Sequence, residues 1–259
     1  MIDLDKRAAF CRDVALSAGA IARDGFARRA PGFGMKGPQD FLTETDMAVE
    51  AHFKERLAEA FPEDGFLGEE TGGVIRPDCW VLDPIDGTAN FARGIPHFCI
   101  SIAFVSTGAT EIGAIYNPSV DELYFAQRGR GATRNGAPIA VAATTNFDAA
   151  SVELGWSNRR PDSLFLSAVA EILRRGANVR RAASGALGLA FVADGRSDAY
   201  AELHMHPWDC LAGLLLVKEA GGCVGPFLHP DGLTQGGAVL AAAPGIAAGI
   251  SAATGIALE

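Results

Sequence analysis

The chain has 259 residues, of which 49% are hydrophobic and 20% charged, and its formal net charge is −9. This composition supports a large buried core, excludes a disordered chain, and argues against a stand-alone nucleic-acid binder, because phosphate backbones favour Lys/Arg-rich surfaces. Five scattered cysteines without C-x-x-C spacing and an N-terminus without a signal peptide predict free thiols in the cytoplasm, and no zinc site or disulfide framework.

The first half of the chain predicts two helices followed by a sheet. Apolar residues recur at helical spacing over residues 3–29, and a second helix over residues 45–61 ends where Pro62 cannot continue it. Between them, a Gly/Pro-rich segment predicts a loop up to residue 39. An opening strand, WVLDPID, is followed by FCISIAFV, TEIGAIYNP, ELYFAQRG and the hairpin arm RNGAPIAVA. We therefore expect a helix pair on an antiparallel sheet, with a type I′ turn at Asn135-Gly136.

The second half alternates strands and helices. Strands are predicted at residues 150–156, 178–182 and 198–204, and helices at residues 160–176, 184–195 and 208–222. Such alternation is typical of an α/β layer. We therefore expect two units, an N-terminal one over residues 1–147 and a C-terminal one over residues 148–259.

The C-terminal end superficially resembles a membrane span, because residues 232–258 carry no charge. Pro244 and many Gly and Ala residues interrupt this segment and make it weakly hydrophobic. It predicts a buried strand, GGAVLAA, followed by a helix of small residues, GIAAGISAATG. We therefore expect no membrane partner.

Carboxylates at the ends of apolar elements are the main chemical signal. Asp83 and Asp86 lie where the strand in WVLDPIDGTANF runs into a turn, and two anions at such a place repel each other unless a cation lies between them. Glu69-Glu70 follows an apolar pair, and Asp209 begins an apolar helix. Singly, each acid fits a structural role, as a helix cap, a first-turn acid or a loop surface. Together they form an oxygen-only set that suits Mg²⁺ or Mn²⁺ rather than zinc.

Other motifs indicate no competing chemistry. The segment AASGAL lacks the glycine that a nucleophile elbow requires before Ser184, and GRGATRNG lacks the third glycine of a dinucleotide loop. His204 and His206 alternate at strand spacing, and the simplest interpretation is a pair of strand-end histidines rather than metal ligands.

Three motifs, DPIDGTANF, the upstream GEE and HPWDCLAGLLLVKEAGG, resemble those of the inositol monophosphatase family in order and separation. Supporting matches are KGPQDFLTETD, GRGATRNG and DAYAELHMHPWD, so the resemblance covers essentially the whole chain. It implies a layered α/β/α/β/α sandwich, built as a homodimer. It also implies lithium-sensitive, Mg²⁺-dependent hydrolysis of a small phosphomonoester by an activated water.

The resemblance also implies a role for individual residues. Two or three Mg²⁺ ions, with Mn²⁺ as a substitute, would be held by Glu69, Asp83, the carbonyl of Ile85, Asp86 and Asp209, with Asp83 as the bridge. Thr88 and Asp46 would orient and deprotonate the attacking water. The substrate would contact the backbone N–H groups of Gly87 and Thr88, and also Ser184, Gly185, Glu202 and Asp209.

The sequence does not decide between the candidate substrates. Family members with an AELHMHPWD-type segment recognise polyols, which favours myo-inositol monophosphate, and relatives with the same metal machinery hydrolyse histidinol phosphate. Where relatives commonly read GSAAL, this chain reads Ala183-Ser184-Gly185-Ala186-Leu187. A regulatory binding module of the RNA machinery is an alternative from another class, although the acidic chain argues against direct contact with nucleic acid. A structural protein with decayed catalysis is disfavoured, because every acid of the motif set is present.

Overall fold

The computed structural model describes residues 2–28, 34–37 and 40–259. Within the loop expected before residue 39, residues 29–33 and 38–39 lie outside the described residues, and so does the Pro38-Gln39 part of the KGPQDFLTETD motif. The described part corrects the prediction, because β1 (Gly34–Gly37) pairs antiparallel with β2 (Asp40–Leu42). Short extended segments can satisfy each other's backbone groups without any hydrophobic periodicity that a sequence would reveal.

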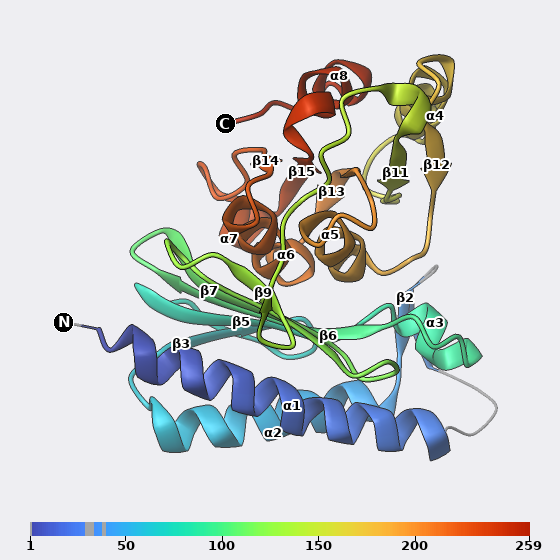
Figure 1. Ribbon diagram of the computed structural model, residues 1–259. Helices are drawn as coiled ribbons and strands as arrows, with labels where there is room; N and C mark the ends of the chain where they lie inside the picture. The colour runs from blue at the N-terminus through green and yellow to red at the C-terminus, as the bar shows by residue number, and fades with distance from the viewer. Residues whose placement is uncertain (1, 29–33, 38–39) are drawn as a thin grey trace.

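The two N-terminal helices are confirmed as α1 (Leu4–Arg28) and α2 (Glu44–Ala60). In α1 the buried face carries small residues such as Ala8, Cys11, Ala15 and Ala18, which let the helix lie close to its neighbours. Both helices lie along one face of the first sheet (Figure 1).

The first sheet has eight strands in the order β10-β9-β8-β7-β6-β5-β3-β4. Their bounds are β3 (Gly65–Gly68), β4 (Gly72–Val74), β5 (Asp78–Asp86), β6 (Cys99–Ser106), β7 (Ala109–Asn117), β8 (Glu122–Gln127), β9 (Ala132–Arg134) and β10 (Ala137–Pro138). The strands that the sequence predicted, β5 to β10, pair antiparallel as expected. The sequence analysis did not predict β3 and β4, and β3 pairs parallel with β5. The β9–β10 turn has positive φ at Asn135 and Gly136, as a type I′ turn requires.

The second sheet has five strands in the order β12-β11-β13-β15-β14. It contains β11 (Ser151–Leu154), β12 (Asn178–Arg180), β13 (Ala199–Met205), β14 (Cys223–Val224) and β15 (Gly237–Ala242). The helices around it are α4 (Asp162–Arg174), α5 (Gly185–Ala193), α6 (Pro207–Glu219), the short α7 (Gly232–Gln235) and α8 (Pro244–Thr254). The expected alternation of strands and helices is confirmed, and β15 with α8 accounts for most of the uncharged C-terminal segment.

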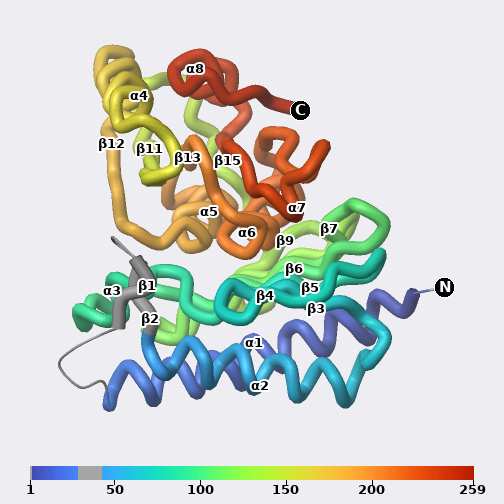
Figure 2. The backbone as a smooth tube through the Cα atoms, turned by 180° about the vertical axis from the view of Figure 1, so that it is seen from behind, coloured from blue at the N-terminus to red at the C-terminus, as the bar shows by residue number. Residues whose placement is uncertain are grey.

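The elements stack into five layers, confirming the α/β/α/β/α sandwich. From one side to the other, these layers are α1 with α2, the first sheet, α5 with α6, the second sheet, and α4 with α8 (Figure 1). The view from behind shows the same order, with the N-terminus beside the first sheet and the C-terminus near α8 (Figure 2). Helix α6 is apolar around its whole circumference because it lies between two sheets, and Leu214, Leu215 and Leu216 are all buried there.

All five cysteines are free, and four of them are fully buried. Within the described residues, no helix is both long and apolar enough to cross a membrane.

Candidate active site

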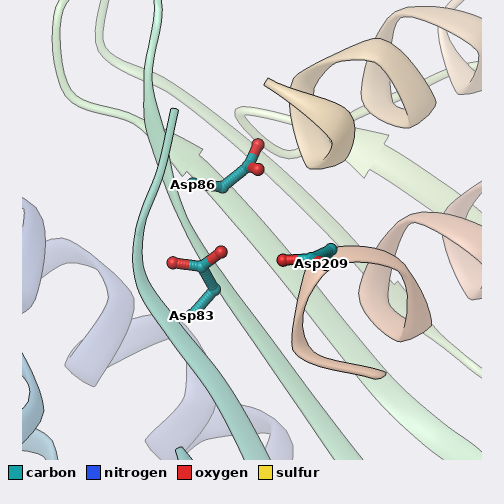
Figure 3. A group of neighbouring side chains, drawn as sticks. All are labelled: Asp83, Asp86 and Asp209. Atoms are coloured by element: carbon teal, nitrogen blue, oxygen red, sulfur yellow. The ribbon is translucent and has the colours of Figure 1, made fainter. Parts of the chain in front are cut away.

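Three aspartates from two elements meet at one point. Asp83 and Asp86 lie at the end of β5, and Asp209 lies in the first turn of α6 (Figure 3). One carboxylate oxygen from each lies within 4.8 Å of the others. Because β5 belongs to the first sheet and α6 to the central helix layer, the cluster exists only when these two layers are packed together.

The local sequence positions each carboxylate through backbone hydrogen bonds. The Ile85 N–H donates to Asp83 Oδ1 at 2.9 Å, and the regular pairing of β5 with β6 is interrupted between Asp83 and Asp86. The His206 N–H donates to Asp209 Oδ2 at 3.0 Å, so Asp209 is the first-turn acid that its position in the helix predicted. Such bonds fix the acids before any ligand binds.

Asp86 does not cap the helix that follows it. Gly87 is the N-cap of α3 (Thr88–Arg93), and the Asp86 carboxylate instead accepts hydrogen bonds at the start of α5. The donors are the Ala186 N–H at 2.9 Å, the Gly185 N–H at 3.2 Å and the Ser184 hydroxyl. Asp86 therefore ties β5 to the central helix layer, and the polar groups of Ser184 and Gly185 are directed at this carboxylate.

Burial and mutual repulsion raise the pKa values of the cluster. Burial raises the pKa of Asp83 well above its usual range, and the charges of Glu69, Asp86 and Asp209 raise it further. Burial raises the pKa of Asp209 to about 7, with Asp86 adding to the shift. The pKa of Asp86 is also raised by burial, although its hydrogen bonds from α5 oppose the shift. Three neighbouring acids that resist ionisation form a site that a divalent cation would stabilise.

Glu69 approaches Asp83 from the turn between β3 and β4. Its backbone N–H donates to the Leu82 carbonyl at 3.2 Å, and its charge is the leading Coulombic contribution to the raised pKa of Asp83. The carboxylate of Glu69 lines the same cleft as Asp86 and Asp209.

Glu50 of α2 holds this turn in place, and the sequence analysis missed it. Its side chain is 1% exposed and accepts hydrogen bonds from the Glu70 N–H at 3.0 Å, the Thr71 N–H at 3.1 Å and the Thr71 hydroxyl. Gly68 permits this approach, because a Cβ there would lie 2.5 Å from Glu50 Oε2. The only signal in the sequence is a glutamate on the apolar face of a helix.

Thr88 and Asp46 lie beside the aspartates. The Thr88 hydroxyl lies 2.9 Å from the Ile85 carbonyl oxygen and 3.4 Å from Asp46 Oδ1. Asp46 is fully buried in the first turn of α2, where the Thr43 N–H donates to its other oxygen at 2.9 Å. Burial raises the pKa of Asp46 to about 6, and the hydrogen bonds from Thr43 oppose that shift.

A cleft of about 480 Å³ opens in front of these groups. Gly87, Ser184 and Gly185 line one part of it, and a Cβ at Gly87 would lie 3.0 Å from the His97 carbonyl oxygen, so a side chain there would be crowded. Glu202 of β13 lies at another part of the cleft, where the Tyr200 hydroxyl donates to its Oε2 at 2.6 Å. Burial raises the pKa of Glu202 to about 7.

His204 and His206 make contacts of the kind that hold a fold together. His204 Nε2 lies 3.1 Å from the Gln235 carbonyl oxygen, and the His206 ring stacks on Trp208 with their centroids 4.6 Å apart. Neither belongs to the aspartate cluster that the described residues form.

Comparison with known proteins decides the family. The sequence profile of the inositol monophosphatase family matches residues 3–255. The chain belongs to the inositol monophosphatase family. An inositol-1-monophosphatase of Mesorhizobium japonicum is 39% identical over 212 residues, which cover 80% of this chain and 80% of that protein.

Two further relatives carry a different name. The Nus factor SuhB of Escherichia coli K12 is 36% identical over 214 residues, covering 81% of this chain and 80% of that protein. The structure of the extragenic suppressor protein SuhB from Bartonella henselae has a TM-score of 0.88 and 31% identity, covering 95% of this chain and 97% of that one.

Ala183, the first residue of the Ala183–Leu187 segment, has a strained backbone. Its φ is 59°, in the left-handed region that disfavours a Cβ. Its carbonyl oxygen accepts a hydrogen bond from Asn90 Nδ2 at 3.2 Å, so this conformation links the N-terminus of α5 to α3.

Replacing Ala183 by glycine should stabilise the protein. Relief of the left-handed strain outweighs the extra chain entropy of glycine, for a gain of about 0.5–1 kcal/mol in the free energy of unfolding. Urea denaturation measures it, and the exposed helical Ala170→Gly, where φ is negative, serves as the control that loses stability. A less stable Ala183→Gly protein would show that Ala183 makes contacts worth more than its strain.

Without metal, the protein should be more stable at pH 5.5 than at pH 7.5. Asp46, Glu202 and Asp209 have folded pKa values of about 6, 7 and 7, above the unfolded value of roughly 4, so folding takes up protons. Their contribution is full below the unfolded pKa and is lost as pH rises through the folded values. His97 and His204, whose pKa values are lowered by burial, oppose this trend but are fewer than the acids.

The measurement is the melting temperature in excess chelator at the two pH values. Asp209→Asn should reduce the difference, because it removes one of the groups that take up a proton. A melting temperature that is constant or rises toward pH 7.5 would contradict the assignment of raised pKa values.

Proposed function

We propose that this protein is a Mg²⁺-dependent phosphatase that hydrolyses a small phosphomonoester, with myo-inositol monophosphate as the leading substrate. The observation that carries the proposal is the cluster of Asp83, Asp86 and Asp209 at the base of a cleft, beside Thr88 and Asp46. Family membership supports the same chemistry.

The donor set fits divalent magnesium. Glu69, the Ile85 carbonyl and the three aspartates offer only oxygen atoms. The pKa values of Asp83 and Asp209 are raised by burial and also by repulsion from neighbouring carboxylates, and positive charge would relieve that repulsion. When bound, Mg²⁺ ions supply charge that polarises a phosphate and lowers the pKa of water.

The chain's own groups position the water and take up its proton. The Thr88 hydroxyl lies between the Ile85 carbonyl and Asp46, so its oxygen can accept a hydrogen bond from a water in the cleft while its proton points to one of these acceptors. A pKa of about 6 makes Asp46 a stronger base than an ordinary aspartate. The N–H groups of Gly87 and Thr88 at the start of α3 are the proposed phosphate contacts.

Substrate recognition is assigned to Glu202, with Ser184, Gly185 and Asp209. Glu202 lines the cleft next to Asp209 and Tyr200, where a carboxylate accepts hydrogen bonds from polyol hydroxyls. The same carboxylate would pair with the amine of histidinol phosphate, which is the second candidate substrate.

The name Nus factor, carried by the SuhB relatives, supports a second candidate of another class, a regulatory role in the RNA machinery. The complete acid set favours the enzyme, and the net charge of −9 argues against direct contact with nucleic acid.

We further propose that the protein is a cytoplasmic homodimer, that lithium inhibits it, and that Mn²⁺ can substitute for Mg²⁺. The division into units over residues 1–147 and 148–259 follows the two sheets.

Asp83→Asn tests the metal site. The neutral amide should abolish both phosphate release and the Mg²⁺-binding signal in calorimetry, because Asp83 is proposed to contact two ions. In chelator, the variant should be as stable as the parent or more so, since one repelling charge is gone. A variant that binds Mg²⁺ and turns over like the parent would rule out the site.

Thr88→Ala tests the proton path. Because the hydroxyl acts on the water rather than on the bound substrate, kcat should fall by roughly a hundredfold or more while KM changes little. Thr88→Ser keeps the hydroxyl and should retain more activity. If Thr88→Ala changes KM alone, Thr88 is a binding residue only.

Glu202→Gln separates the two substrates. An amide oxygen still accepts from a polyol hydroxyl, so kcat/KM on myo-inositol monophosphate should fall by roughly tenfold or less. With histidinol phosphate both partners are ionised, and the loss should be on the order of a hundredfold. Equal kinetics of parent and variant on both compounds would remove Glu202 from the substrate pocket.

A further inference from the structure

Arginines without an ion-pair partner gather at the cleft. Within the C-terminal half, Arg174 and Arg175 pair with Glu171, Arg180 pairs with Glu153, and Arg196 pairs with Glu122. The remaining arginines of that half are Arg159, Arg160 and Arg181, and no carboxylate of the described residues forms an ion pair with them.

Arg159 and Arg181 both line the cleft that holds the aspartates. They reach it from different segments, the loop after β11 and the residue that follows β12, so the fold brings them to one wall. The chain as a whole has a net charge of −9, but this wall of the cleft carries two exposed guanidinium groups that form no ion pair with a described carboxylate. The wall is therefore positively charged on a protein that is negatively charged overall.

An aromatic side chain belongs to the same wall. Trp156 lines the cleft, its indole N–H donates to Asp162 Oδ1 at 2.8 Å, and the Arg181 guanidinium lies 6.0 Å from its ring centroid. The indole orientation is therefore fixed, and Trp156 can support Arg181 over its face.

The loop that carries Arg159 lies directly against Glu202. A Cβ at Gly155 would be 1.8 Å from Glu202 Oε2, and the Gly155 N–H donates to the Ala201 carbonyl at 3.0 Å. The arginines do not neutralise Glu202 by direct contact, because its Oε2 is engaged by the Tyr200 hydroxyl and no ion pair joins the groups. Both arginines are close enough to Glu202 for their charges to act on its carboxylate, and they line the same cleft.

We propose that Arg159 and Arg181, supported by Trp156, form an anion subsite, so that the preferred substrate carries a second anionic group besides the phosphate that is hydrolysed. Guanidinium groups bind carboxylate and phosphate through paired hydrogen bonds, so either group fits. The inference rests on the proposed phosphatase function and keeps its metal site and reaction. It replaces myo-inositol monophosphate, as the preferred substrate, by phosphomonoesters that carry a carboxylate or a second phosphate.

The test compares matched substrates that differ by one anion. Sorbitol 6-phosphate and 6-phosphogluconate share a six-carbon chain and differ in a terminal carboxylate, and myo-inositol 1-phosphate and myo-inositol 1,4-bisphosphate differ in a second phosphate. For at least one pair, kcat/KM for phosphate release with Mg²⁺ should be roughly tenfold or more higher for the anionic member. The pair that shows the preference identifies the group that is bound.

The variants connect that preference to the arginines. In Arg159→Gln/Arg181→Gln, the ratio of kcat/KM values within the pair should fall toward one, whereas Arg159→Lys/Arg181→Lys should keep part of it because the charge remains. Arg130→Gln, an exposed arginine outside the cleft that pairs with Asp5, is the matched control and should leave the ratio unchanged. The parental preference should also weaken with added salt.

The rise in melting temperature that each compound causes in the presence of Mg²⁺ gives a readout independent of turnover. A larger rise with the anionic member, lost in the double Gln variant, supports the subsite even for slowly hydrolysed compounds. No preference in either kinetics or melting temperature, or a preference that survives the double Gln variant, overturns the subsite. Failure to release phosphate from any of the four compounds would instead count against the phosphatase function.

Discussion

The mutual repulsion of buried carboxylates at the end of β5 is the constraint on which the rest of the site depends. Asp83, Asp86 and Asp209 lie too close together and too deep to ionise freely, as their raised pKa values show. A fold retains such a group only if surrounding interactions hold it in place. Here the hydrogen bonds from Ile85, from the start of α5 and from His206 hold the carboxylates in place, and a divalent cation bound between them would relieve their remaining repulsion.

The central helix layer is the element that makes this arrangement possible. Helix α6 contacts both sheets, contributes Asp209 and is apolar on all sides, while the start of α5 donates hydrogen bonds to Asp86. The same packing that buries the leucines of α6 therefore brings carboxylates from the two halves of the chain together. Loss of that packing would remove the proposed metal site and part of the core in one step, so the stability of the fold and the proposed function depend on the same contacts.

Two kinds of charge share one cleft, and they lie on different segments. The acids come from β5, α6 and the turn after β3, which are held by buried hydrogen bonds, whereas Arg159 and Arg181 extend from exposed loops near Trp156. Acids held by buried hydrogen bonds suit a reaction that requires fixed geometry, and exposed basic side chains on loops suit recognition of a substrate.

The sequence by itself determined the helices, most strands and the family, and it predicted an oxygen-only set of candidate metal ligands, because these depend on local periodicity and on motifs that are continuous in the chain. Only the tertiary structure decided that β3 pairs parallel with β5 and that Asp86 accepts hydrogen bonds from the start of α5. It also decided that Glu50 accepts hydrogen bonds from the turn that carries Glu69. It also decided which arginines stay unpaired beside the cleft. These features join residues far apart in the chain, and a hydrogen bond or an ion pair depends on distances that only the packing of the layers sets.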